Sequence, residues 1–428
     1  MTGPKVVLCN VWHDDNKGDS AIAIGTVRLV RHVWPDAQIT VVGLTEEKSP
    51  ARGSMRHLDR AAPGLTLRGS VLPTELRGRR RAFPVVDVPV WLARLAPHVV
   101  RAARGRLDDD LAELFSGCDL AIGVGGSNLY IDRSVSPAVS LARLFTVARP
   151  LSAAARAGVP TVLLGHTLGP FPSERKTSWR IARRLLSDVG AVVVRDGTSV
   201  GVAEALGVDA ELAPDLAYAA RSQAPAPTPA GRQVVVALRQ HPSEPAAAAG
   251  RLIGEIADAV QTLRDAGLVD SVLVVAHTLG PTPIEDDRAI SRTAARIFAE
   301  RGLPTAYNEA DRSPEGLIDL YATGAAMIAV RLHAAILAMT SGTPTFTVSY
   351  FSTKARGVMT DAGVGECVGE YTDVVARDIV GALTPLLEDG FSRARLAKHS
   401  EANAAHLRAR ATSWFTGAHQ TDHSQGDS

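Results

Sequence analysis

Short apolar runs alternate with helical segments along most of this sequence, and the alternation restricts the fold more than any other feature. In the first half, strands are expected at residues 6–10, 38–42, 120–124, 161–164 and 191–194, with a helix at 19–34. These runs are mostly apolar throughout, which is typical of strands buried on both faces. The pattern predicts βαβ units that build a parallel sheet covered by helices.

The same alternation starts again after a proline-rich stretch at residues 221–231. Three prolines among small residues cannot pack into an element, so we expect an interdomain linker there. Beyond it, strands are predicted at residues 234–238, 271–276, 326–330 and 345–348, and helices at 251–266, 286–301 and 371–387. A chain of 428 residues is also too long for a single core, so about two domains are expected.

We therefore predict an α/β protein with an N-terminal domain over residues 1–220, a linker over 221–231 and a C-terminal domain over 232–415. The helical stretch at 392–414 is expected to cross back to the first domain, and residues 416–428 to form a disordered tail. Ligands of open parallel sheets bind beyond the carboxyl ends of the strands. The predicted site is therefore a cleft between the two domains.

Composition excludes several classes of protein. Apolar residues make up 46% of the chain and charged residues 21%, as in globular proteins. A net charge of +1 provides no overall attraction to nucleic acid, so any bound anion must be held by local geometry. No apolar run approaches ~18 residues, and the short strand near the N-terminus does not fit a signal peptide. Three distant cysteines fit neither a disulfide framework nor a zinc site, and favour a cytoplasmic location.

The motif with most chemical content is Arg331-Leu332-His333. A predicted buried strand stops at Arg331, and a helix is expected to begin around His333. A guanidinium fork, an imidazole and the free N–H groups of a helix start then converge on one spot, which suits a phosphate or carboxylate. His333 can also exchange a proton near neutral pH. The alternative interpretation is a structural Arg–Asp pair with a capping histidine.

Lys354 supports an anion site in the same half of the chain. It is expected on the opening turn of the helix that follows the strand at 345–348. A cation there is unfavourable for the helix itself, so a bound anion would explain its position. Arg239 ends another predicted strand, and His277 follows the next one. Asp286-Asp287 are expected simply to begin a helix, where negative charge is favoured.

The turn after the first predicted strand carries a second candidate site. Asn16 and Gly18 tolerate the tight backbone of a strand-to-helix turn, and Asp19 or Ser20 can cap the helix. Free N–H groups at that helix start can bind a ligand oxygen. Ordinary turn chemistry explains the same residues equally well.

Three further strands of the first half end in polar or glycine-rich loops. Gly125-Gly126-Ser127 lets the backbone approach a ligand and adds a hydroxyl, although glycine pairs are common in loops. His166 lies on the edge where ligands bind, and a structural role is as well supported as a catalytic one. Arg195 is expected to pair with Asp196 or Asp215 rather than to contact a substrate.

The segment from residue 77 to residue 106 is unusually basic. One interpretation is a solvated excursion between elements. The other is a peripheral patch that contacts anionic lipid or a lipid-linked substrate. The arginines of this segment are Arg77, Arg79, Arg80, Arg81, Arg94, Arg101, Arg104 and Arg106.

Taken together, these motifs resemble the polysaccharide pyruvyl transferase family, and their order is kept from about residue 6 to residue 361. The matching pieces are Asn16-Lys17-Gly18-Asp19, Gly125-Gly126-Ser127, the Gly165 to Phe171 loop, Arg195-Asp196, Pro214 to Ala217, His277, Asp286-Asp287, Arg331-Leu332-His333, Gly342-Thr343-Pro344 and Tyr350 to Lys354. Ser127 stands where a third glycine is common, and the loop before Asn16 carries extra residues, so the acceptor stays open.

The resemblance implies a glycosyltransferase-B-like fold of two Rossmann-like domains, with the acceptor on the N-terminal side and phosphoenolpyruvate on the C-terminal side. The family forms a cyclic ketal on two hydroxyls of a sugar in a polysaccharide or glycolipid precursor and releases phosphate. Arg331 and His333 are then expected to bind phosphoenolpyruvate, together with either Arg195 or Arg239. The other expected substrate contacts are Leu332, Lys354, Asn16, Gly18, Gly125, Gly126, Ser127 and His277.

For the chemistry, we expect His333 to be the general acid and His166 or Asp19 to accept the acceptor's proton. No cofactor or metal is required by this scheme. A homo-oligomer and a location at the inner face of the membrane are further expectations. The alternative functions are a nucleotide-sugar glycosyltransferase with the same fold and a protein that binds anions or glycans without catalysis.

Overall fold

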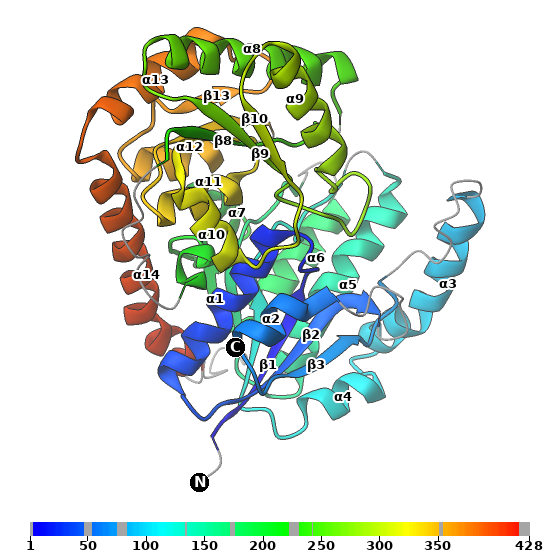
Figure 1. Ribbon diagram of the computed structural model, residues 1–428. Helices are drawn as coiled ribbons and strands as arrows, with labels where there is room; N and C mark the ends of the chain where they lie inside the picture. Colours follow the sequence, from blue (N-terminus) through cyan, green and yellow to red (C-terminus); the bar gives the residue numbers. More distant parts are fainter. Residues whose placement is uncertain are drawn as a thin grey trace. The chain divides into compact units, whose positions relative to one another are not determined.

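The computed structural model describes residues 3–46, 54–74, 84–132, 135–171, 176–221, 231–241, 243–350 and 354–418 (Figure 1). The chain divides into two compact units. Unit 1 comprises Met1–His13, Ile22–Leu216 and His406–Ser428, and unit 2 comprises Asp14–Ala21 and Ala217–Ala405. Most of the expected linker at 221–231 and most of the expected tail at 416–428 lie outside the described residues.

Unit 1 is built on a sheet of seven parallel strands in the order β3-β2-β1-β4-β5-β6-β7. All five strands predicted for this half are confirmed. β4 and β5 are buried at every residue, so helices and loops cover both faces of the sheet, as predicted. The strands are β1 (Lys5–Val11), β2 (Gln38–Glu46), β3 (Thr66–Ser70), β4 (Leu120–Val124), β5 (Thr161–His166), β6 (Ala191–Val194) and β7 (Glu211–Leu212).

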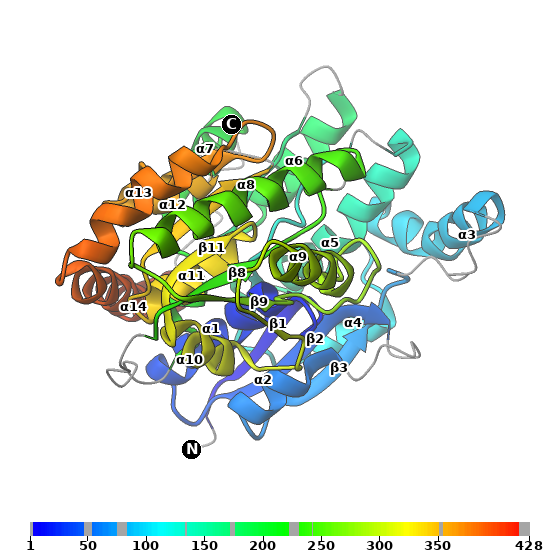
Figure 2. The same cartoon turned by 45° about the horizontal axis from the view of Figure 1, so that its top comes forward.

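The helices of unit 1 alternate with these strands. Both views show that α3 stands at the margin of the unit, beside α5 and away from the sheet (Figures 1 and 2). The helices are α1 (Lys17–Val33), whose first turn belongs to unit 2, α2 (Arg56–Ala61), α3 (Pro84–Ala103), α4 (Asp109–Phe115), α5 (Pro137–Arg156), α6 (Lys176–Ser187) and α7 (Gly197–Ala205).

Unit 2 repeats the same topology with six parallel strands in the order β10-β9-β8-β11-β12-β13. The strands are β8 (Gln233–Ala237), β9 (Ser271–Val275), β10 (Thr305–Asn308), β11 (Gly324–Ala329), β12 (Thr345–Ser349) and β13 (Val368–Glu370). The helices are α8 (Ala246–Asp265), α9 (Arg288–Glu300), α10 (Pro314–Ala322), α11 (Leu332–Thr340), α12 (Lys354–Asp361), α13 (Ala376–Glu388) and α14 (Ser392–Gly417), which ends in unit 1.

Both sheets have the strand order of doubly wound folds, which confirms the prediction of two Rossmann-like domains. In such a sheet the strand order reverses at one point, where the carboxyl ends of two neighbouring strands diverge and leave room for a ligand. In unit 2 this point lies between β8 and β11, which pair in parallel. Arg239 and Arg331 follow these two strands at a distance of two residues.

Each sheet is covered by its own hydrophobic core. In unit 2, the β11 residue Ile328 and the β12 residue Phe346 are buried with Met339 of α11 and Leu383 of α13. Burying a side chain of this size contributes ~1.5–3 kcal/mol, so the core fixes α11 and the loop before it against the sheet. None of the helices within the described ranges is long and apolar enough to cross a membrane.

The segment Asp14–Ala21 belongs to unit 2, although the chain on both sides of it belongs to unit 1. We had expected it within the N-terminal domain. Its backbone accepts a hydrogen bond at Asp15 O from Leu279 N, at 2.9 Å, and Lys17 forms an ion pair with Asp311. These long-range contacts attach the turn to the C-terminal sheet, which places Asn16, Gly18 and Asp19 in the same unit as Arg331.

Candidate functional site

The Arg331-Leu332-His333 motif forms the junction between β11 and α11, as predicted. Arg331 is the N-cap residue of α11 with an extended backbone (φ −100°, ψ 126°), and Leu332 is the first helical residue. No side chain caps this helix end. Its first N–H groups have no acceptor within the helix, and the positive end of the helix dipole lies there.

The guanidinium of Arg331 forms a bidentate pair with the carboxylate of Asp287. Nε donates to Oδ2 and Nη2 donates to Oδ1, both at 2.7 Å, and Nη2 also donates to the carbonyl of Glu285. Burial disfavours the charge of Arg331, but the carboxylate outweighs it and raises the pKa of the guanidinium. The structural pair that was the alternative interpretation is therefore present. These hydrogen bonds use Nε and Nη2, and no described residue hydrogen-bonds Nη1.

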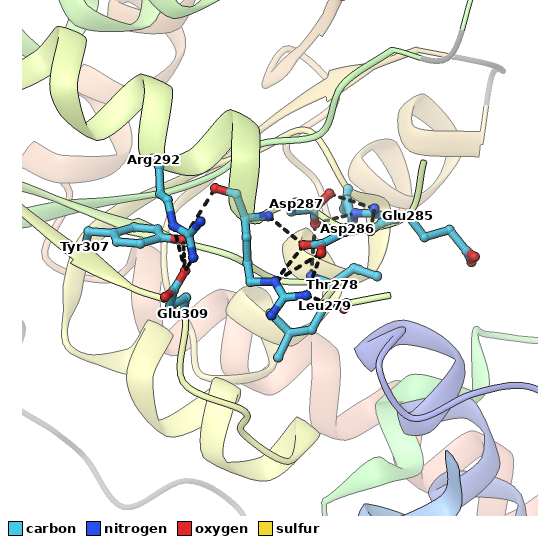
Figure 3. Close-up of polar contacts among 10 residues, drawn as sticks. Thr278, Leu279, Glu285, Asp286, Asp287, Arg292, Tyr307 and Glu309 are labelled. Carbon is cyan, nitrogen blue, oxygen red and sulfur yellow. Dashed lines mark hydrogen bonds and ion pairs between the residues drawn. The ribbon is translucent and has the colours of Figure 1, made fainter. Parts of the chain in front are cut away.

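Asp287 is held in turn by the loop that follows β9. Its Oδ2 accepts a hydrogen bond of 2.9 Å from the backbone N–H of Thr278, and its own N–H donates to the Thr278 carbonyl (Figure 3). Asp287 is the N-cap residue of α9, but its side chain makes no capping hydrogen bond. The expectation that Asp286-Asp287 begin a helix is confirmed, but the carboxylate of Asp287 has a second role that was not expected, because it fixes Arg331. Asp286 binds the neighbouring Arg288 instead.

Gly18 lies directly against the ring of His333. A Cβ atom at Gly18 would lie 2.2 Å from His333 Nδ1, 2.4 Å from Cγ and 2.7 Å from Cβ, so any side chain there would force His333 to shift. Asn16 rather than Asp19 or Ser20 takes the capping role, because its Oδ1 accepts from the N–H of Asp19 at 3.5 Å and the helix already begins at Lys17. The glycine predicted for a tight turn is thus required by the approach of the histidine.

Lys17 is a buried cation at the same place. Its side chain is 2% exposed, and Nζ donates to Asp311 Oδ1 at 2.6 Å and to the carbonyl of Asp14 at 2.9 Å. A buried ammonium is stable only when it is paired in this way. Sequence reasoning did not propose Lys17 as a site residue. The argument that singled out Lys354, a cation in the first turn of a helix, applies to it equally.

His277 follows β9 and is also buried. Its Nδ1 shares a hydrogen bond of 2.8 Å with the hydroxyl of Tyr321, while Nε2 is buried and has no partner among the described residues. Burial lowers the pKa of the ring well below its ordinary value, and the positive charges of Arg331, His333 and Lys17 add to the effect. The ring of His277 is therefore neutral at physiological pH.

Arg239 completes the basic side chains of this part of unit 2. Its Nη1 donates to the hydroxyl of Tyr350, and its guanidinium lies over the Tyr350 ring, 4.8 Å from the centroid. Burial raises the pKa of Asp287, and the positive charges of Arg331 and Arg239 both oppose that shift. Both arginines therefore stabilise the charged form of the same carboxylate. Lys354 is the first residue of α12, as predicted. Leu332 packs against the core.

Unit 1 gathers a second set of the predicted residues around Arg195. This side chain donates from Nη1 to Asp215 Oδ2 at 2.7 Å, from Nε to Thr167 Oγ1 at 3.1 Å and from Nη2 to Ser127 Oγ at 3.1 Å. The predicted pairing with Asp215 is confirmed. Asp196 instead caps α7 and accepts a hydrogen bond from Thr167.

His166 lies beneath this cluster as the last residue of β5. The ring is fully buried, and neither nitrogen has a hydrogen-bond partner in the described part of the chain. Burial and then the charge of Arg195 lower its pKa to about 3. The ring is therefore neutral and a weak base at physiological pH.

Gly125 has a packing reason that the sequence did not reveal. A Cβ atom at this position would lie 2.4 Å from the carbonyl oxygen of Gly165 in the neighbouring strand. The backbone thus approaches another strand, whether or not a ligand binds there. The carbonyl of Gly126 accepts a hydrogen bond of 2.9 Å from the N–H of Thr167, which ties the two loops together.

The predicted residues thus fall into two groups, one in each unit. Unit 2 holds the group with Arg331 and His333, and it adds two residues that the prediction had left out, Lys17 and Asp287. Among the described residues, no three His, Cys, Asp or Glu side chains are grouped as a metal site. The unit 2 group comprises Asn16, Lys17, Gly18, Asp19, Arg239, His277, Asp287, Arg331, Leu332, His333 and Lys354, and the unit 1 group comprises Gly125, Gly126, Ser127, His166 and Arg195.

A family model described as polysaccharide pyruvyl transferase matches residues 16–352 of this chain. That range contains every predicted site residue except Lys354. No curated protein matches the chain.

Solved structures with the same fold are distant in sequence. A UDP-N-acetylglucosamine 2-epimerase is 14% identical with a TM-score of 0.54, covering 100% of this chain and 99% of its own. A trehalose-6-phosphate structure from E. coli, bound with UDP-2-fluoro glucose, is 12% identical with a TM-score of 0.58, covering 98% and 99%. The calicheamicin glycosyltransferase CalG4 is 14% identical with a TM-score of 0.50, covering 98% and 100%. These likenesses confirm the glycosyltransferase-B-like fold and nothing further.

Proposed function

This chain belongs to the polysaccharide pyruvyl transferase family, and from that premise we propose that it transfers pyruvate from phosphoenolpyruvate to two hydroxyls of a sugar. The product is a cyclic ketal on a polysaccharide or glycolipid precursor, and phosphate is released. The observation that carries the proposal is the group of cationic side chains in unit 2, in which the backbone at Gly18 contacts the ring of His333.

Phosphoenolpyruvate carries a carboxylate and a phosphate, so its site needs several cationic or N–H donors. Arg331 offers a guanidinium at the N-terminus of α11, where the helix dipole also favours an anion. Asp287 holds the other side of the same guanidinium in a fixed orientation, which places the donor before the substrate binds. Lys354 supplies a further positive charge at the start of α12.

We assign the second arginine of the donor site to Arg239 rather than to Arg195. The charge of Arg239, like that of Arg331, stabilises the carboxylate of Asp287. The Nε of Arg239 is buried with no acceptor among the residues described. In contrast, Arg195 already binds Asp215, Thr167 and Ser127 with three of its nitrogens. An arginine with a free buried donor is the better candidate for a substrate contact.

The proposed reaction begins when His333 protonates the methylene carbon of phosphoenolpyruvate, which makes the adjacent carbon electrophilic. One sugar hydroxyl attacks that carbon and loses its proton to a base. The bond to phosphate then breaks, and the second hydroxyl closes the ketal and gives its proton to the leaving phosphate. We assign the base to Asp19, one residue from the glycine that contacts His333, since His166 is a weak base. The scheme uses no resident metal or cofactor.

The test is an assay of the purified protein with phosphoenolpyruvate and a β-galactoside or N-acetylmannosamine acceptor. Phosphate release and a ketal product should require both substrates, and in D2O the new methyl group should contain one deuterium. His333→Gln should lower turnover by about 10²–10⁴-fold. His399→Gln, in α14 and beside Asn403, is the matched control and should leave turnover unchanged. Full turnover in His333→Gln would remove His333 from the mechanism.

The alternative is a nucleotide-sugar glycosyltransferase, which the fold alone supports. Thermal-shift measurements separate the two functions. Stabilisation by phosphoenolpyruvate but not by UDP- or GDP-sugars is the expected result. The reverse result would favour glycosyl transfer.

A further inference from the structure

The helix α3 of unit 1 exposes an apolar face. Val90 is 50% exposed, Val99 43% and Val100 46%, and these are three of only seven large apolar side chains exposed in the described part of the chain. On the helix, Val90, Ala93, Pro97 and Val100 are three or four residues apart and lie on one exposed side. A contiguous apolar face on a solvent-facing helix is the kind of feature that marks an interaction surface, in contrast to single exposed apolar side chains.

The opposite side of α3 is already packed, so the exposed side is not an unfinished core. Trp91 and Leu95 are buried against Val139 and Ala142 of α5. The indole N–H of Trp91 donates to the carbonyl of Pro73 at 2.7 Å. The helix is therefore fixed to unit 1 by one face and presents the other.

The sequence of the segment that contains α3 is rich in arginine. The segment from residue 75 to residue 106 contains eight arginines and two carboxylates, Glu75 and Asp87, in a chain with a net charge of only +1. Of the eight, Arg77, Arg79, Arg80 and Arg81 lie outside the described residues.

The described arginines at the C-terminal end of α3 are exposed. Arg101 approaches Asp108 at 3.8 Å and its side chain is still 46% exposed. Arg104 and Arg106 follow on the exposed surface. The next exposed acids, Asp109 and Asp110, lie in the first turn of α4.

We propose that α3 is a docking surface for an anionic lipid bilayer. The helix would lie parallel to the membrane, with the stripe from Val90 to Val100 among the headgroups and Arg101, Arg104 and Arg106 on lipid phosphates. A protein partner is less suited to this face, because protein interfaces use large anchors such as tryptophan and tyrosine. The exposed side chains here are valine, alanine and proline, and the helix's only tryptophan points inward.

The test measures binding of the full chain to vesicles of phosphatidylcholine with and without phosphatidylglycerol. Wild type should sediment with the anionic vesicles at low salt and dissociate at high salt. Arg101→Gln/Arg104→Gln/Arg106→Gln should weaken binding about a hundredfold, roughly fivefold per arginine. The matched control, Arg180→Gln/Arg183→Gln/Arg184→Gln, removes the same charge from exposed positions on α6 and should bind like wild type. Equal losses in the two triple variants would overturn the proposal.

A second pair of variants tests the apolar face. Val90→Ser/Val100→Ser should reduce vesicle binding at least tenfold without changing turnover on a small acceptor. The control is Leu212→Ser, at another exposed apolar position of unit 1, which should change neither. Two results would overturn the proposal: equal binding to neutral and anionic vesicles, or a dimer in solution that the valine substitutions dissociate, since the latter would show that a second copy covers this face.

Discussion

Replacing Gly18 with alanine should reduce turnover about 10²-fold in a protein that still folds. The added Cβ would lie 2.2 Å from Nδ1 of His333, and an ordinary contact needs ~3.5–4.0 Å, so the ring must retreat by more than ~1 Å. Rotating the ring does not relieve the contact, because the Cβ of His333 is itself only 2.7 Å away. A displacement of this size in a catalytic group costs about 10²-fold in rate, or ~2.7 kcal/mol of the barrier.

Stability should fall only in part, because two effects oppose each other. Overpacking costs ~1–3 kcal/mol, whereas alanine favours the helix over glycine by up to ~1 kcal/mol. The net loss of ~0–3 kcal/mol should lower Tm by several degrees at most. The assay is kcat/KM from phosphate release, with Tm measured on the same samples.

Gly250→Ala in α8 is the matched control for this experiment. It is a helical glycine of the same unit with nothing within 4 Å of the added Cβ. It should raise Tm slightly and leave kcat/KM unchanged. If Gly18→Ala kept kcat/KM within about twofold of wild type, the contact between Gly18 and His333 would have no part in turnover, and the proposed role of His333 would lose its structural support.

Two further predictions concern the buried side chains of Asp287 and His166. Asp287→Asn should destabilise the protein by ~3–5 kcal/mol in urea unfolding, because it leaves Arg331 buried without its partner, whereas Asp286→Asn should cost under ~1 kcal/mol. A small loss in Asp287→Asn would show that the pair is dispensable. Because the folded-state pKa of His166 is about 3, the folded protein keeps this ring neutral. Below pH ~6.5 this histidine is protonated in the unfolded chain but not in the folded one. The free energy of unfolding should therefore be unaffected by His166 above pH ~6.5 and fall by up to ~1.4 kcal/mol per pH unit below it. His166→Gln should therefore flatten the pH dependence of unfolding between pH 7 and 5, and equal slopes would contradict the argument.

The central strands were the most predictable part of the fold. β4 and β6 begin and end at the predicted residues, because each is a short run that is almost entirely apolar. The strands β3, β7, β10 and β13 were missed. β3 reads Thr-Leu-Arg-Gly-Ser and β10 reads Thr-Ala-Tyr-Asn, and neither has an apolar run. These strands lie at or next to the edges of the sheets, where pairing with a distant neighbour, rather than local sequence, decides that they form.

The position of the Arg331 site could be predicted from the sequence, but the distant residues that contact Arg331 and His333 could not. A strand that ends in Arg331 and a helix that starts at Leu332 are both visible in the local pattern. The partner, Asp287, lies 44 residues away, and its own surroundings indicate only a helix start. The segment with Lys17 and Gly18 is more distant still. Its packing against unit 2 depends on contacts that no local pattern encodes.

The excursion of Asp14–Ala21 into unit 2 has a consequence for how this protein can be divided and recombined. A fragment that starts at residue 217 would contain every strand of the second sheet. It would lack Lys17, which pairs with Asp311, and Gly18, which contacts the ring of His333. The C-terminal half is therefore not a transplantable module. A chimera that exchanges the halves at the proline-rich stretch would combine His333 of one parent with the Asp14–Ala21 segment of the other. We expect it to be active only if the eight residues of that segment are exchanged as well.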